Sequence, residues 1–344
     1  GHLWCPYYPC HERNSKLNLI LKKFFIFFLI FSLQNNLECI IIQLLQRFRY
    51  SNYLFLEKFM QFGHFDDEKR EYVIETPRTP YPWINYLGSQ KFFSLISNTS
   101  GGYSFYTDAR LRRLTRYRYN DMPLDNNGHY FFIKDGDTVW NPGWQPSQTE
   151  LDSYECRHGF GYSRFTSKKN DLQAQALYFV PNNEPCEVEM ITLKNEGKAD
   201  KNISLVSFVE WCLYNASDDC QNFQRNFSTG EVEIEGSVIY HKTEYRERRN
   251  HFAFYSCNEK IDGFDTDRET FLGLYNSISA PKTVVEGKSG NSIADGWSPI
   301  ASHRINVTLK PGEEKTYVFV LGYIENETDK KFLNEADKKK ALDA

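Results

Sequence analysis

Near the middle of the chain stand three strand-like runs, Ala174-Gln175-Ala176-Leu177-Tyr178-Phe179-Val180, Val188-Glu189-Met190-Ile191-Thr192-Leu193 and Ile203-Ser204-Leu205-Val206-Ser207-Phe208-Val209-Glu210-Trp211-Cys212-Leu213. They are rich in β-branched and aromatic residues, and much of their length alternates between polar and apolar positions. The turn sequence Asn195-Glu196-Gly197 separates the second run from the third. Runs so closely spaced, with no helical pattern between them, predict antiparallel strands.

Similar runs extend toward both ends of the chain, at Tyr72–Ile74, Tyr130–Ile133, Glu231–Glu235, Phe252–Tyr255, Ile305–Leu309 and Thr316–Leu321. Turn sequences at Lys134–Asp137, Ile234–Ser237 and Lys310–Glu313 carry the Gly, Asp and Pro residues that tight turns use. We therefore expect an all-β fold, a large antiparallel β-sandwich that spans residues 60–325. A charged helical pattern from Glu327 to Leu342 predicts the start of a linker helix within residues 326–344, and with it a fragment of a longer protein.

Composition narrows the possible functions. The 344 residues carry a net charge of -4 and are 16% aromatic. This charge gives no overall field that would attract nucleic acid or an anionic membrane, so neither is an expected partner. The eight cysteines show neither CxxC pairs nor zinc-finger spacing, and we interpret them as reduced thiols of a cytoplasmic protein.

Residues 1–59 differ from the remainder of the chain. Lys22-Lys23 precede an apolar run of ten residues, Phe24–Leu33, which is shorter than the roughly 20 residues of a membrane helix. A secretory signal is one interpretation, although the small-residue cleavage site is missing. We favour a leader outside the fold, translated from upstream sequence, with Met60 as the natural start. Removing residues 1–59 should then leave folding intact.

The run Asn222-Phe223-Gln224-Arg225-Asn226 follows the third central strand and a polar break. Two asparagines, a glutamine and an arginine around one phenylalanine form a donor set suited to hydroxyl groups and phosphate oxygens. A loop after a strand is a common place for binding residues, although a solvated loop over a tucked phenylalanine is the simpler alternative.

Five arginines crowd the segment Arg110–Arg118. If Arg116-Tyr117-Arg118-Tyr119 is a strand, its arginines share one face and its tyrosines the other. Phosphate, sugar or RNA could bind such a surface, but ion pairs with acidic partners are the commoner arrangement, and we expect a structural role.

The tryptophans are candidates for a sugar-binding platform, and the histidines are candidates for metal ligands. Trp140-Asn141-Pro142-Gly143-Trp144 resembles a turn, so Trp140 and Trp144 are the possible sugar platform, although most tryptophans belong to the core. No HExxH or other ligand spacing occurs among His129, His158, His241, His251 and His303, so we predict no metal site.

Several of these strings together resemble the amino-terminal part of the cellobiose phosphorylase family: Tyr81–Gly88, Ser94–Arg118, Asn222–Asn226, Gly230–Gly236 and Gly263–Glu269. The resemblance covers nearly everything from Met60 to about Glu325. It implies a galactose-mutarotase-like super-sandwich, followed in that family by linker helices and an (α/α)6 barrel that holds the catalytic aspartate.

The family's activity implies a glycosyltransferase-class enzyme, an inverting phosphorylase that splits cellobiose with inorganic phosphate into α-glucose 1-phosphate and glucose. Phosphate is a co-substrate, and no cofactor is implied. The general acid belongs to the barrel, so no catalytic residue is assigned to this chain. Family members are homodimers in which an amino-terminal loop reaches the partner's active site, and Asn222, Gln224 and Arg225 occupy the matching loop as substrate-binding residues.

Two other functions stay open for the chain alone. It could be a non-catalytic carbohydrate-binding β-sandwich with Trp140 or Trp144 as its platform. It could also be a scaffold and dimerisation module that ignores sugar, which is the reading we favour for the isolated chain.

Overall fold

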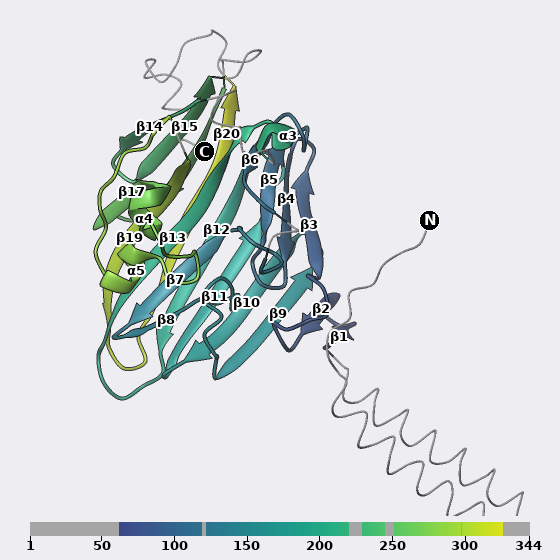
Figure 1. Ribbon diagram of the computed structural model, residues 1–344. Coiled ribbons are helices and arrows are strands. Elements are labelled where there is room, and N and C mark those ends of the chain that lie inside the picture. The colour runs from purple at the N-terminus through teal and green to yellow at the C-terminus, as the bar shows by residue number, and fades with distance from the viewer. Residues whose placement is uncertain (1–61, 119–121, 220–228, 245–250, 297, 326–344) are drawn as a thin grey trace, which may run out of the picture. The chain divides into compact units, whose positions relative to one another are not determined.

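The computed structural model describes residues 62–118, 122–219, 229–244, 251–296 and 298–325, and strands dominate them (Figure 1). Eleven strands form one sheet, in the spatial order β1 (Gly63–Asp66), β2 (Glu71–Ile74), β9 (Ser153–Gly159), β10 (Tyr162–Lys169), β11 (Leu172–Phe179), β12 (Cys186–Asn195), β20 (Glu314–Glu325), β16 (His251–Cys257), β15 (Val238–Glu244), β14 (Thr229–Glu235) and β18 (Asp295–Gly296).

Nine strands form the second sheet. Seven of them follow the order β17 (Gly263–Asp267), β19 (Pro299–Leu309), β13 (Lys201–Tyr214), β6 (Arg113–Thr115), β5 (Gly102–Tyr106), β4 (Phe92–Ser97) and β3 (Ile84–Ser89). The other two are β7 (Tyr130–Asp135), which pairs with β13, and β8 (Thr138–Trp140), which pairs with β7. The named strands of the described chain pair antiparallel throughout, which confirms the predicted large antiparallel β-sandwich.

The main core contains side chains from both sheets, and strand β11 shows why. Alternate residues of β11 are buried, and they are the apolar residues Leu172, Ala174, Ala176 and Tyr178. Successive side chains of a strand point to opposite faces, so this alternation directs one face of β11 inward. The period-two pattern in the sequence therefore corresponds to one buried face.

Strand β13 is buried on both faces, which explains its nearly continuous apolar sequence. Leu205, Val209 and Trp211 belong to the main core, whereas Val206 and Phe208 belong to a second core. Central strands of this kind lose the polar alternation that marks a half-exposed strand.

Two short helices complete the second core on the outer side of β13 and β7. They are α4 (Arg268–Leu272) and α5 (Lys282–Glu286), seen beside β7, β13 and β19 in Figure 1. Phe271 of α4 stacks on Phe208 with ring centroids 5.2 Å apart, and Val284 of α5 is fully buried. The Asp267 carboxylate accepts a hydrogen bond from the Thr270 amide at 2.8 Å and caps α4.

The predicted turns lie between the predicted strands. Gly136 joins β7 to β8 and Gly236 joins β14 to β15, each with φ of 60°, a left-handed conformation that glycine adopts most readily. Helices α4 and α5 were not predicted, because each is only five residues long and shows little periodicity.

Some predictions fall outside the described residues: the leader 1–59, the linker helix within 326–344 and the run Asn222–Asn226. The cysteines within the described part, Cys156, Cys186, Cys212 and Cys257, are free and buried. None of the helices described above has the length and apolar character needed to span a bilayer.

Candidate functional site

The described polar residues that come directly before the predicted binding loop form the turn that follows β13. Helix α3 (Ala216–Asp219) is one short turn, and the side-chain oxygen of Asn215 accepts from the amides of Ser217 and Asp218 at 3.0 and 3.3 Å. This contact caps the helix start. The chain then continues into residues 220–228, so Asn222, Gln224 and Arg225 come directly after α3 but lie outside the described residues.

Arg116 holds this turn against the sheet. Its side chain is buried, and its Nη1 lies 2.5 Å from Oε1 of Glu210, on β13. Its Nε donates to both carboxylate oxygens of Asp219, at 2.9 and 3.0 Å, and its Nη2 lies 2.8 Å from Asp219 Oδ1. The fork of the guanidinium therefore joins a strand residue to the last residue of α3, a geometry that lysine cannot reproduce.

A second arginine balances the charge. Arg268 Nε, at the start of α4, lies 3.1 Å from Glu210 Oε1, so two guanidinium groups face two carboxylates. Burial alone would raise the pKa of Glu210, but the charges of Arg116 and Arg268 outweigh it and lower that pKa below its usual value. Burial would likewise lower the pKa of Arg116, and Glu210 and Asp219 raise it instead. These shifts favour the charged forms of Glu210 and Arg116 at neutral pH.

Two more arginines of the same run contact the turn. Arg110 donates from Nε to Ser217 Oγ at 3.0 Å, and its carbonyl accepts from the Ala216 amide at 2.7 Å. Arg118 donates to the carbonyl of Asp219 at 3.4 Å. We name Arg110, Arg116 and Arg118, with Glu210 and residues 215–219, the arginine anchor.

The last two arginines of the run contact other parts of the fold. Arg112 pairs with Glu325 at 2.9 Å, and Arg113 lies over the Tyr103 ring at 3.9 Å. The expectation of a strand through Arg116-Tyr117-Arg118 was wrong, because β6 ends at Thr115 where Arg116 turns to its buried partners. The structural role predicted for the five arginines agrees with these contacts.

The prediction that Trp140 could be a sugar platform was wrong. Its side chain is 0% exposed and belongs to the main core, so a sugar ring cannot stack on it. Trp144 is half-buried, with the guanidinium carbon of Arg78 5.4 Å from its ring centroid. Trp144 alone therefore stays a prediction as a platform.

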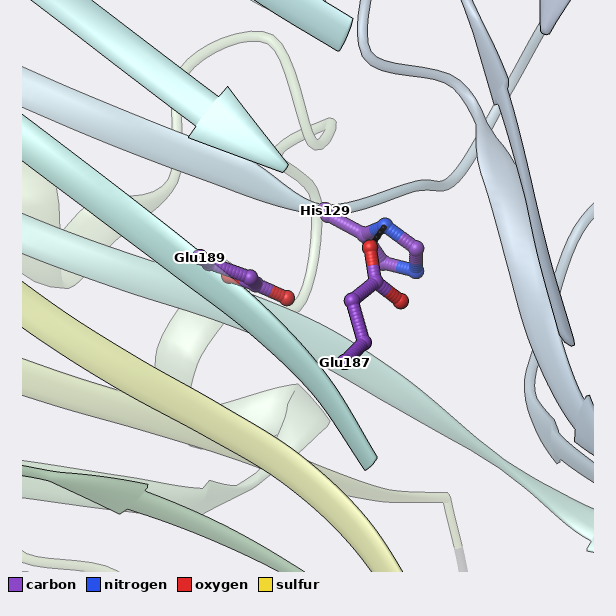
Figure 2. Close-up of side chains that lie close together, drawn as sticks. All are labelled: His129, Glu187 and Glu189. Carbon is purple, nitrogen blue, oxygen red and sulfur yellow. Dashed lines mark ion pairs between the residues drawn. The ribbon is translucent and has the colours of Figure 1, made fainter. Parts of the chain in front are cut away.

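A second polar cluster is buried inside the sandwich (Figure 2). His129 precedes β7 in one sheet, while Glu187 and Glu189 lie on the inward face of β12 in the other. All three are at most 1% exposed, and His129 Nδ1 lies 3.2 Å from Glu187 Oε1. One potential ligand atom from each residue lies within 4.8 Å of the others. We name these three residues the core triad.

Neighbouring hydroxyl groups bind the outer atoms of the core triad. Ser104 Oγ donates to Glu187 Oε2 at 2.6 Å and lies 3.4 Å from His129 Nε2. Tyr255 donates to Glu189 Oε2 at 3.0 Å. Burial raises the pKa of Glu189, and the nearby Glu187 adds to this effect. Burial would lower the pKa of His129, but the Glu187 carboxylate raises it.

Sequence reasoning missed the core triad because its members come from different sheets. Only the spacing of Glu187 and Glu189 by two residues was visible, and that spacing predicts a shared strand face without saying which face is buried. Glu189 lies in the predicted run Val188–Leu193, and Glu187 directly precedes it, in a position where an ionisable residue is ordinarily exposed to solvent.

Two facing antiparallel sheets of eleven and nine strands place this protein in the class of β-supersandwich domains. The particular family follows from its sequence: the chain belongs to the family described as "Glycosyl hydrolase 94, supersandwich domain", whose model matches residues 70–341.

Curated relatives agree with this assignment. N,N'-diacetylchitobiose phosphorylase from Vibrio proteolyticus is 36% identical over 268 residues, which are 76% of this chain and 33% of that protein. Solabiose phosphorylase from Paenibacillus borealis is 31% identical over 271 residues, 78% of this chain and 35% of the relative. The chain thus spans about a third of the length of the curated relatives it matches.

Among solved structures, the chain is similar to a galactose mutarotase related enzyme from Lactobacillus acidophilus, with a TM-score of 0.41 and 8% identity. That match covers 72% of this chain and 100% of the other. A bacterial glucoamylase complexed with acarbose gives a TM-score of 0.43 at 11% identity, over 80% of this chain and 38% of the other.

Proposed function

We propose that this chain is the scaffold domain of an inverting phosphorylase that cleaves β-linked disaccharides with inorganic phosphate. The observation that carries this proposal is the family match across residues 70–341, together with relatives whose names denote disaccharide phosphorylases. Phosphate is the nucleophile and co-substrate in this proposal, and no cofactor takes part.

In this proposal, the general acid of the reaction belongs to another part of the enzyme. An inverting phosphorolysis needs one carboxylic acid to protonate the leaving oxygen, while phosphate attacks from the opposite face of the sugar. The buried carboxylates Glu210 and Asp219 are engaged by Arg116, and Glu187 and Glu189 are enclosed between the sheets. We therefore assign the general acid to a catalytic barrel and none of the catalytic groups to this chain.

The contribution of this domain is then to hold a binding loop in place. The arginine anchor fixes residues 215–219, and the chain runs from there into Asn222, Gln224 and Arg225. We propose that the protein is a homodimer in which these three side chains complete the partner's sugar site through hydrogen bonds to hydroxyl groups. Amide and guanidinium donors match that task.

Substrate and location are parts of the same proposal. Cellobiose is the disaccharide implied by the resemblance, and N,N'-diacetylchitobiose is the one in the names of two relatives, so both belong in the test. The free thiols of the described cysteines agree with a cytoplasmic location.

A domain exchange tests this proposal. Residues 62–325 replace the matching third of the Vibrio proteolyticus relative, and phosphate consumption is measured with N,N'-diacetylchitobiose and with cellobiose. We expect sugar-dependent phosphate consumption by this chimera with at least one of them. A soluble, dimeric chimera that consumes no phosphate, beside an active parent enzyme, would contradict the proposed function.

A further inference from the structure

The core triad contains three buried polar atoms, one from each residue, that make no well-formed hydrogen bond within the described residues. Two of them, His129 Nδ1 and Glu187 Oε1, form an ion pair with each other at 3.2 Å, and the third, Glu189 Oε1, has no polar partner there. The remaining oxygens of Glu187 and Glu189 accept from Ser104 and Tyr255. A buried polar atom without a partner is costly, and Glu189 Oε1 is such an atom in a group whose potential ligand atoms lie within 4.8 Å of one another, which indicates a missing occupant.

We propose that the core triad binds one Zn²⁺ ion between the two sheets. The donor set is one imidazole nitrogen and two carboxylate oxygens, all of them known zinc ligands. Ligand atoms around a tetrahedral zinc lie about 3.3–3.6 Å from each other, given bond lengths of about 2.0–2.2 Å. The 3.2 Å between His129 Nδ1 and Glu187 Oε1 matches this spacing, and the 4.8 Å limit for the whole set needs only small side-chain rotations.

Charge favours the same occupant. With the ion bound, the two glutamates bind as carboxylates and the histidine as a neutral imidazole, so their two negative charges balance one divalent cation. Ser104 and Tyr255 then orient the ligands by binding the atoms that the metal does not use, as neighbours of metal ligands commonly do.

Other cations fit this site less well. Calcium takes six to eight oxygen ligands, and magnesium usually keeps several waters. The core triad offers two carboxylates and one imidazole, and its side chains are at most 1% exposed. Enclosure of this degree also means that the ion enters while the chain folds and serves stability. The proposal opposes the sequence-based expectation of no metal site, which rested on spacing along the chain.

Metal content of the chain, expressed with zinc in the medium and purified without chelator, tests the proposal. We expect about one zinc per chain by mass spectrometry. Glu189→Gln keeps the shape of the side chain and removes its charge, and we expect it to lower zinc at least about tenfold. Glu71→Gln is the matched control, because Glu71 is a buried carboxylate paired with Arg157 away from the triad, and it should keep the zinc. Equal zinc in the wild type and Glu189→Gln would contradict the proposal.

Refolding provides a measurement that does not depend on a variant. The wild-type chain is unfolded with chelator, then refolded with excess Zn²⁺, with Mg²⁺ or with no metal. We expect Zn²⁺ alone to raise the melting temperature, by about 5–10 °C at a concentration 100 times the dissociation constant. Identical melting temperatures in the three samples, with zinc below about a tenth of an equivalent, would overturn the proposal.

Discussion

Arg116 pairs with two carboxylates from different parts of the chain, Glu210 on β13 and Asp219 at the end of α3. Glu210 and Asp219 are both buried, at 2% and 3% exposure. Breaking a buried ion pair by removing one partner is far more costly than losing a surface pair. Arg116 therefore matters for the stability of the sandwich as well as for the position of the turn at residues 215–219.

Replacing Arg116 with alanine tests this dependence. We expect Arg116→Ala to lower the free energy of unfolding by about 3–5 kcal/mol, because Glu210 and Asp219 lose the buried guanidinium that pairs with both of them, and Arg268 stays close to Glu210 alone. Urea unfolding of the isolated chain measures the change. Lys260→Ala, at an exposed lysine, is the control and should leave the free energy nearly unchanged. If Arg116→Ala proves as mild as the control, the ion cluster does not stabilise the fold.

Arg225 follows the same turn in the sequence and is one of the three residues proposed to bind the sugar. In the chimera described above, we expect Arg225→Ala to lower phosphorolysis about 10- to 100-fold, the effect of losing one or two charged hydrogen bonds to substrate. Lys260→Ala in the same chimera should stay within about twofold of the unmodified chimera. Equal activities of the two variants would remove Arg225 from the proposed sugar site.

At the scale of elements, β13 contributes both to the core and to the arginine anchor. One of its faces packs in the main core, and Glu210, near its end, pairs with Arg116. Because the pKa of Glu210 is lowered in the folded protein, the stability of the fold depends on pH through this residue. A carboxyl whose pKa is lower in the folded state adds stability above its unfolded pKa, near 4.5, and loses it as the pH falls through the folded value.

Acid titration of stability tests this relation. We expect the free energy of unfolding to fall as the pH decreases below about 4.5, and to fall less steeply in Glu210→Gln, which cannot take up the proton. Other paired carboxylates, such as Glu71, provide a slope common to both proteins. Parallel slopes for wild type and Glu210→Gln would show that Glu210 does not contribute to acid sensitivity.

Helices α4 and α5 depend on the second core. Phe271 is fully buried, with its ring 5.2 Å from Phe208 and 6.3 Å from Phe132. We expect Phe271→Ala to cost about 3–5 kcal/mol and to speed hydrogen exchange in both helices more than in β11. Leu274→Ala, at a side chain that is 77% exposed, is the control. Unchanged exchange in α4 and α5 would mean that other contacts hold them.

The elements also show how much of the fold the sequence could predict. The strands at Ala174–Val180, Val188–Leu193 and Ile203–Leu213 were predicted to within a few residues, because β-branched residues and turn glycines mark them. Strands β4 and β5 were not predicted as strands, and most of their sequence entered only through the family resemblance of Ser94–Arg118. Their buried serines, Ser94 and Ser104, give no apolar alternation, since they face the polar core triad.

The site was less predictable than the fold. Trp140 looked like an exposed turn residue, yet its ring fills the core, and neighbouring sequence carries no information on which side of a turn faces inward. The core triad joins His129 to Glu187 and Glu189 across two sheets, a contact that only the packing of the sandwich creates. The arginine anchor was visible as a charge cluster, but its acidic partners 94 and 103 residues away were not.

At the scale of the whole molecule, the described chain has the organisation of a scaffold. Its arginine anchor is ion-paired, its core triad is enclosed, and Trp140, one of the two tryptophans predicted as a sugar platform, is buried. The central claim is therefore our proposal that this domain supports a phosphorylase active site and performs no chemistry by itself, for which the family match and the arginine anchor are the grounds.

Phosphate release from α-glucose 1-phosphate and glucose, measured with the purified chain, tests that claim most directly. We expect no release above the enzyme-free control from a chain whose circular dichroism shows a folded β-sheet protein. Release that depends on both sugars and rises with protein concentration would contradict the claim and require a general acid within these residues.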